Sequence, residues 1–214
     1  MALRTLTFGD LSSGFWGAAW ELGEGQPGFA LLGDGAVQAN LTDDWRLHGD
    51  GVELEASADR DAELVIVRGQ VGERSVECLG HRSFHDGFDP SLHKSIRDVS
   101  AWFSADDGLA VLSARGAGAR GHADDVVTVS AFEAGQPVPI EEPRLSTTYD
   151  GDGVPIRASL ELWPEVVEEG DELERPVTHP IRAAGEAAGS PASTAIGSLT
   201  VQARLFRWHA RGLE

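Results

Sequence analysis

The sequence predicts an all-β protein in which antiparallel strands form two sandwich-like or barrel-like halves. Hydrophobic and polar residues alternate along most of the chain, as in strands with one buried face. Glycine-rich and Asp-Gly turn signals separate these segments at hairpin spacing. Short strands without a long helical pattern are typical of an antiparallel sandwich or barrel, and the chain length suggests about a dozen strands.

The first half alternates clearly from residue 15 onward. Residues 16, 18, 20 and 22 place two tryptophans and two small or aliphatic residues on one strand face. Residues 29–32 and 36–38 flank a glycine-rich turn and read as a hairpin. Residues 52–56 alternate valine, leucine and alanine with glutamate, whereas residues 64–67 are apolar throughout and predict a strand buried on both faces.

The second half contains further strand patterns at residues 96–103, 109–113 and 127–131. The clearest hairpin joins residues 145–149 to residues 156–162 through Asp150-Gly151-Asp152-Gly153. Near the end, residues 199–208 alternate, and one face mixes polar and aromatic side chains, which suits a cavity lining or a wet surface. Residues 90–97 predict a short helix with Asp89 as its N-cap. Residues 165–174 and 182–193 are predicted to be loops.

These patterns suggest two β units, residues 1–75 and residues 76–214, although one continuous domain is an open alternative. The chain has 214 residues, enough for either arrangement. No letter-by-letter repeat is visible between the two units.

The charge balance excludes several classes of partner. With 17 basic and 35 acidic residues the formal net charge is −18, so nucleic acid and anionic membrane surfaces are disfavoured. The sequence has no apolar stretch long enough for a signal peptide or a membrane span. A single cysteine precludes an intrachain disulfide and fits a reducing compartment. We therefore expect a cytoplasmic protein.

The main candidate for chemistry is a histidine-rich stretch that we interpret as a loop. His81, His85 and His93 are three of the seven histidines, and the only cysteine, Cys78, and the only lysine, Lys94, lie beside them. The spacing of His81 and His85 resembles that of zinc ligands on a helix, but Arg82 follows where a metalloprotease carries glutamate. We therefore predict no metal.

Proton transfer is the functional interpretation of this stretch. A histidine titrates near neutral pH, and a neighbouring carboxylate can orient it, so His81, His85 and Asp86 are the predicted catalytic residues. The alternative is structural, with the imidazoles fixing a long loop through backbone hydrogen bonds. No activated nucleophile is recognisable.

A glycine-rich motif at residues 116–121 matches the dinucleotide-binding pattern GxGxxG. A dinucleotide site needs a helix next, so that its N-terminus can hold the pyrophosphate. A β-branched strand pattern with two leading aspartates follows instead. We predict a hairpin loop here and no cofactor.

Aromatic residues in the strand patterns are the candidates for ligand binding. If several of them face one interior they would form an apolar pocket. Ordinary core packing is the alternative interpretation. The predicted ligand-binding residues are Trp16, Trp20, Trp102, Tyr149 and Trp208.

The hairpin at residues 145–162, together with Phe206-Arg207-Trp208, resembles the second half of the lipocalin-like AttH and carotenoid 1,2-hydratase group. The resemblance covers residues 95–210 and lies in the order of strands and turns. It implies two lipocalin-like halves, and it implies chemistry on isoprenoid or polyketide chains. It transfers no catalytic residue.

Taken together, these observations suggest a protein that binds a hydrophobic small molecule, such as an isoprenoid or polyketide, in an aromatic-lined β cavity. Cofactor-independent hydration or cyclisation by proton transfer is the first hypothesis. The alternatives are a non-catalytic carrier of an apolar ligand and a structural protein that forms a homodimer.

Overall fold

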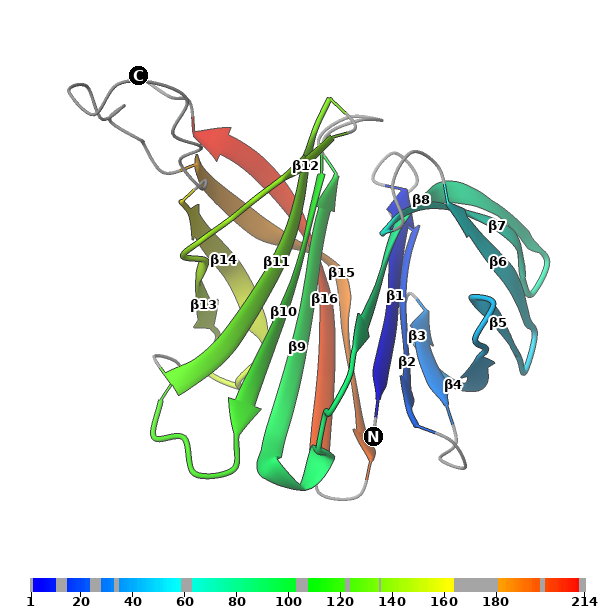
Figure 1. Ribbon diagram of the computed structural model, residues 1–214, viewed down its shortest axis with the longest axis horizontal. Coiled ribbons are helices and arrows are strands. Elements are labelled where there is room, and N and C mark those ends of the chain that lie inside the picture. Colours follow the sequence, from blue (N-terminus) through cyan, green and yellow to red (C-terminus); the bar gives the residue numbers. More distant parts are fainter. Residues whose placement is uncertain are drawn as a thin grey trace.

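A computed structural model confirms the all-β fold. It describes residues 2–10, 15–23, 28–32, 35–58, 63–102, 108–121, 124–134, 136–163, 181–196 and 199–211. Within these ranges the chain forms sixteen strands and one short 3₁₀ turn, so there are more strands than the dozen predicted. The strands form two sheets that stand side by side (Figure 1).

The first sheet is a closed barrel of eight consecutive strands. Each strand is hydrogen-bonded to the next in sequence, and β8 returns to pair with β1. The strands are β1 (Leu3–Asp10), β2 (Phe15–Leu22), β3 (Phe29–Leu32), β4 (Gly35–Leu41), β5 (Arg46–Gly49), β6 (Val52–Ala58), β7 (Leu64–Val71) and β8 (Arg74–His85). The predicted alternation in residues 52–56 is confirmed, since Val52, Leu54 and Ala56 are buried between exposed glutamates.

Side chains fill the interior of this barrel. Phe8, fully buried, lies at the same level as Gly17 on one neighbouring strand and Gly80 on the other. A Cβ atom at Gly17 would come within 2.3 Å of the Phe8 ring, so glycine is what leaves room for the aromatic side chain. Leucines, valines and alanines from all eight strands complete this core. The barrel interior is therefore a packed core.

The second sheet contains the remaining eight strands in the order β12-β11-β10-β9-β16-β15-β14-β13. The strands are β9 (His93–Trp102), β10 (Gly108–Gly116), β11 (Asp125–Glu133), β12 (Gln136–Val138), β13 (Arg144–Tyr149), β14 (Pro155–Leu162), β15 (Ile181–Ile196) and β16 (Leu199–Arg211). The pairing of β16 with β9 is parallel, an exception to the predicted antiparallel pattern. This is possible because the whole of β10–β15 serves as the long crossover that a parallel pair requires.

The second sheet curves so that its inner face encloses a separate apolar core. Val99, Leu109 and Val111 from β9 and β10 belong to the same buried cluster as Leu145 and Leu160 from β13 and β14. A backbone hydrogen bond of 2.9 Å from the Glu141 N–H to the Trp163 carbonyl also connects the segments beside β12 and β14. Strands far apart in the sheet order therefore face each other.

The outer face of the barrel packs against the outer face of the second sheet. Trp16 and Trp20 on β2 point away from the barrel interior and join a buried cluster with Ile96 on β9 and Leu199 and Val201 on β16. The predicted common face of Trp16, Ala18, Trp20 and Leu22 is confirmed, since all four residues are in this cluster. These two tryptophans form part of the contact between the sheets.

Three local predictions were wrong. The helix predicted at residues 90–97 is a single 3₁₀ turn, Pro90–Leu92, because the alternating residues from His93 onward pair with β10; its N-cap is Asp89, as predicted. Residues 182–193, predicted as a loop, lie in β15, because small side chains pair readily between β14 and β16. The stretch around His81 is strand β8 up to His85, not a loop.

Other predictions agree or lie outside the described residues. The hairpins at residues 29–38 and 145–162 are confirmed by the pairing of β3 with β4 and of β13 with β14. The glycine-rich motif at residues 116–121 connects the antiparallel strands β10 and β11, as expected for a hairpin loop. The loop predicted at residues 165–174 lies outside the described residues.

In the sequence, the last strand of the first sheet ends at His85 and the first strand of the second sheet begins at His93. The boundary predicted between residues 75 and 76 falls inside β8, and the division into domains stays a prediction. In the part of the chain that the structure describes, no helix has the length and apolar character to cross a membrane.

Candidate functional site

The predicted catalytic histidines lie where the barrel meets the second sheet. In β8 the side chains of His81, Ser83 and His85 share one strand face, because alternate residues of a strand point the same way. This face is directed at β10 and β11. We call His81, Ser83, His85, Glu63, Thr5 and Ser130 the junction site.

A carboxylate from the barrel connects the two sheets at this site. Glu63, just before β7, has one carboxylate oxygen 3.5 Å from Nε2 of His81. The hydroxyl of Ser130, on β11, donates a hydrogen bond of 2.8 Å to the same oxygen. The pKa of Glu63 is lowered mainly by its hydrogen bond with His81, and the hydrogen bond from Ser130 lowers it further. Glu63 is therefore ionised at neutral pH, and it lies beside His81, whose side chain is only 6% exposed.

Ser83 and His85 form a second hydrogen-bonded pair. The Ser83 hydroxyl lies 3.0 Å from Nε2 of His85 and 2.6 Å from the hydroxyl of Thr5 on β1. The pKa of His85 lies below its usual 6.5, mainly because the imidazole is buried and also because His81 is nearby. The imidazole of His85 is therefore neutral at pH 7 and can accept a proton.

A small cavity of about 20 Å³ lies among these groups. It has room for about one water molecule. Its polar lining comes from Thr5, His81, Ser83, His85, Thr128 and Ser130, and its apolar lining from Ala110, Val111 and Leu112. Thr7 lies two residues after Thr5, on the same face of β1, and stands opposite His81 in the strand register. Its buried hydroxyl has no hydrogen-bond partner among the described residues. The arrangement suits a bound water beside two imidazoles.

Asp86 and His93 do not join this site. The carboxylate of Asp86 accepts the Gly87 N–H at 2.8 Å in an exposed turn. Nδ1 of His93 lies 2.8 Å from the Asp89 carbonyl, and its ring stacks on Phe88 with the centroids 4.5 Å apart. The contact of His93 with a backbone carbonyl is the kind expected from the structural alternative, in which the imidazoles fix the chain. The structure brings together only His81 and His85 of the predicted catalytic residues.

The structure describes the side chains of three predicted ligand-binding aromatics, and Tyr149 does not lie with Trp16 and Trp20. Trp16 and Trp20 lie between the two sheets. Tyr149 lies at the inner face of the second sheet, where its hydroxyl contacts Arg97. Trp102 ends β9 and Trp208 lies in β16, but their side chains are outside the described set. A ligand-binding role for these residues stays a prediction.

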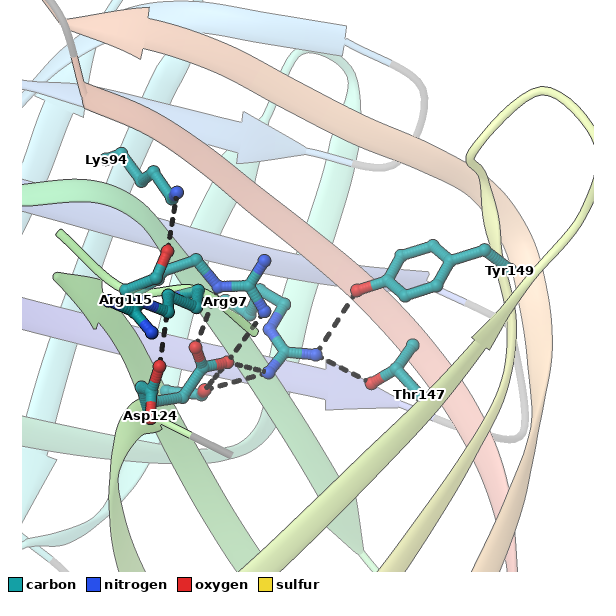
Figure 2. Close-up of polar contacts among 10 residues, drawn as sticks. Lys94, Arg97, Arg115, Asp124, Thr147 and Tyr149 are labelled. Carbon is teal, nitrogen blue, oxygen red and sulfur yellow. Dashed lines mark hydrogen bonds and ion pairs between the residues drawn. The ribbon is translucent and has the colours of Figure 1, made fainter. Parts of the chain in front are cut away.

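A second polar cluster, which we call the arginine–aspartate network, crosses the interior of the second sheet (Figure 2). Arg97 on β9 donates to Asp125 at 2.5 Å and to Ser113 at 3.0 Å. Its other terminal nitrogen donates to Thr147 at 2.9 Å and Tyr149 at 3.2 Å. Since Thr147 and Tyr149 belong to β13, Arg97 connects two distant strands across the interior.

Arg115 completes this network from β10. Its Nε donates to Asp125 at 2.8 Å, and this hydrogen bond raises the pKa of Arg115. The side chain of Asp125 is 1% exposed and that of Arg97 is 8% exposed. Two guanidinium groups therefore compensate the charge of one buried carboxylate, and this explains why Asp125 can lie in a desolvated interior. The geometry is that of a structural connection between β9–β11 and β13.

The sequence patterns did not identify several of these residues as members of a site. Ser83 could have been found by reading residues 81–85 with strand periodicity, since it falls between the two histidines on one face. Glu63 and Asp125 gave no local signal, because their partners are 18 and 28 residues away along the chain. Among the described residues, no group of three or more histidine, cysteine or acidic side chains is arranged to hold a metal ion.

We expect stability at the junction site to fall on acidification. Because the folded state lowers the pKa of His85, the unfolded chain binds more protons below about pH 6.5, so this stability is complete above that pH and is lost as the pH falls toward the folded pKa. Glu63 adds a second loss below its ordinary value of 4.5. Thermal unfolding between pH 5 and pH 8 should show a smaller pH dependence for His85→Gln than for the wild type. The exposed His48→Gln should behave like the wild type, and equal slopes for all three proteins would contradict the prediction.

No protein family, curated protein or solved structure matches this chain.

Proposed function

We propose that the protein binds a small hydrophobic molecule against the solvent side of the junction site and adds a water from its cavity to that molecule by proton transfer, without a cofactor. The observation that supports this proposal is the water-sized cavity lined by His81 and His85, where the barrel meets the second sheet. The partly exposed His85 gives a substrate a route of approach from solvent.

Each polar group then has a chemical role. His85, neutral because burial lowers its pKa, removes a proton from the water while the oxygen attacks the substrate. His81, beside the ionised Glu63, is the proposed general acid and gives a proton to the neighbouring substrate atom. Ser83 is a positioning residue, since its hydrogen bond fixes the ring of His85. The step consumes one water and leaves both histidines to exchange their protons with solvent.

The substrate class comes from the resemblance of residues 145–162 to the carotenoid hydratase group. An isoprenoid or polyketide chain with an activated double bond is therefore our proposed substrate. The sequence also predicts a cytoplasmic location, and a homodimer is the structural alternative to the proposed activity.

Hydration can be tested by oxygen incorporation. The protein would be incubated in ¹⁸O-labelled water with short isoprenoid alcohols and α,β-unsaturated thioesters, and the products analysed by mass spectrometry. We expect His81→Ala and His85→Ala each to slow labelling by about 10²–10⁴-fold, the usual contribution of a general acid or base. His48→Ala, an exposed histidine on β5, should label like the wild type.

Two results would separate this proposal from its alternatives. If the wild type binds a probe but incorporates no label, the enzymatic proposal fails and the non-catalytic carrier is supported. If His85→Ala labels the product at the wild-type rate, His85 has no part in the reaction. Circular dichroism of each variant would show that the fold is retained.

A further inference from the structure

A larger hollow lies on the outer face of β13, β14 and the first residues of β15. Figure 1 shows β13 and β14 on the side of the second sheet away from the barrel. The volume of this hollow is about 420 Å³, within the range of small-molecule sites. We call it the arginine groove, because Arg144, Arg157 and Arg182 line it. It shares no residue with the junction site.

The strand register explains the shape of this groove. Ser146 pairs with Ser159, and Ser159 pairs with Ala184, so a row of short side chains crosses three strands. The row two residues away in one direction contains Arg144, Glu161 and Arg182, and the row in the other direction contains Thr148, Arg157 and Glu186. Alternate residues on these strands, such as Leu145 and Leu160, point into the core, so the three rows face outward. Long side chains flank a floor of short ones.

The distances suit a ligand of a few heavy atoms in width. Neighbouring strands are about 4.8 Å apart, so the serine row extends about 10 Å across the sheet. The two flanking rows are four residues apart along each strand, or about 13 Å. Extended arginine side chains from opposite rows can therefore converge above Ser146 and Ser159.

The three arginines differ in their partners. Arg182 forms an ion pair of 2.8 Å with Glu161, and Arg144 forms one of 3.3 Å with Glu142. Arg157 makes no hydrogen bond or ion pair with another described residue, although Glu186 stands opposite it in the register. Arg157 is therefore the guanidinium most available to a ligand.

The overall charge of −18 does not prevent an anion from binding here. At physiological ionic strength the Debye length is about 8 Å, so distant carboxylates are largely screened. Near the groove the three arginines balance Glu142, Glu161 and Glu186, so an anion would depend on direct contact with Arg157, which has no ion pair with a described residue. A guanidinium forms bidentate hydrogen bonds with phosphate, and serine hydroxyls can donate to the same ligand.

We propose that the arginine groove binds a small polyol phosphate, with its phosphate against Arg157 and its hydroxyl groups above Ser146 and Ser159. The ion pair of Arg182 and Glu161 offers both a donor and an acceptor to those hydroxyls. The groove is thus a ligand site separate from the site of the proposed hydration.

Isothermal titration calorimetry with glycerol 3-phosphate, inorganic phosphate and glycerol tests this assignment. For the wild type we expect saturable binding of glycerol 3-phosphate, weaker binding of inorganic phosphate, and none of glycerol. Arg157→Gln should weaken binding of glycerol 3-phosphate at least tenfold, because it removes a charge-assisted contact. Ser159→Leu should have a similar effect by filling the floor of the groove.

Arg68→Gln provides the matched control. Arg68 is an exposed arginine on the barrel, paired with Glu77, and its loss changes the net charge by the same amount. Its affinity for glycerol 3-phosphate should equal that of the wild type. The proposal is overturned if the wild type binds neither phosphate compound, or if Arg68→Gln and Arg157→Gln weaken binding equally. Equal affinity for phosphate and glycerol 3-phosphate would overturn the role given to the serine row.

Discussion

Replacing Asp125 by alanine is expected to lower the free energy of unfolding by about 3–5 kcal/mol, because Arg97 would remain in the interior of the second sheet without its carboxylate partner. Arg115 would lose the same partner. The contact between β9–β11 and β13 through Arg97 would then be held only by hydroxyl groups. For a chain of this size the loss corresponds to a fall in Tm of roughly 6–20 °C.

Urea denaturation of Asp125→Ala, followed by tryptophan fluorescence, would measure this change. Asp124→Ala is the matched control, since Asp124 is the exposed neighbour whose carboxylate accepts the Arg120 N–H at 2.9 Å. The control should change stability by about 0.5 kcal/mol or less, as surface substitutions usually do. If both variants unfold at the same urea concentration, the network does not hold the second sheet together.

The second large effect is expected in the barrel. Phe8→Ala should destabilise the protein by about 3–5 kcal/mol, the usual result of removing a large buried aromatic side chain. The cavity would persist, because the residues level with Phe8 on both neighbouring strands are Gly17 and Gly80, which have no side chain to move into the space.

Phe84→Ala provides the comparison for this variant. Phe84 is 55% exposed and contacts the Arg4 guanidinium, 5.4 Å from its ring centroid. Its removal should cost about 1 kcal/mol or less, as for an exposed cation–π contact. Thermal unfolding of both variants would measure the difference. A loss at Phe8 as small as that at Phe84 would mean that the barrel core is not packed around Phe8.

The candidate site was only partly predictable. The local abundance of histidine selected His81 and His85, and the structure brings both to one cavity. The same stretch also suggested Asp86, which lies in an exposed turn, because adjacent residues at a strand end do not share a face. The aromatic pocket expected inside a barrel is absent from the first sheet among the described residues, since leucine, valine and Phe8 fill that space.

The amino-acid pattern by itself determined the strand-rich fold, most hairpins and the common face of Trp16 and Trp20, because side-chain alternation and turn chemistry act between near neighbours in the chain. Only the tertiary structure decided that this face packs against the second sheet, that Glu63 reaches both His81 and Ser130, and that Asp125 meets Arg97. These contacts depend on barrel closure and sheet curvature, which set distances between residues far apart in sequence and leave no periodic signal in it.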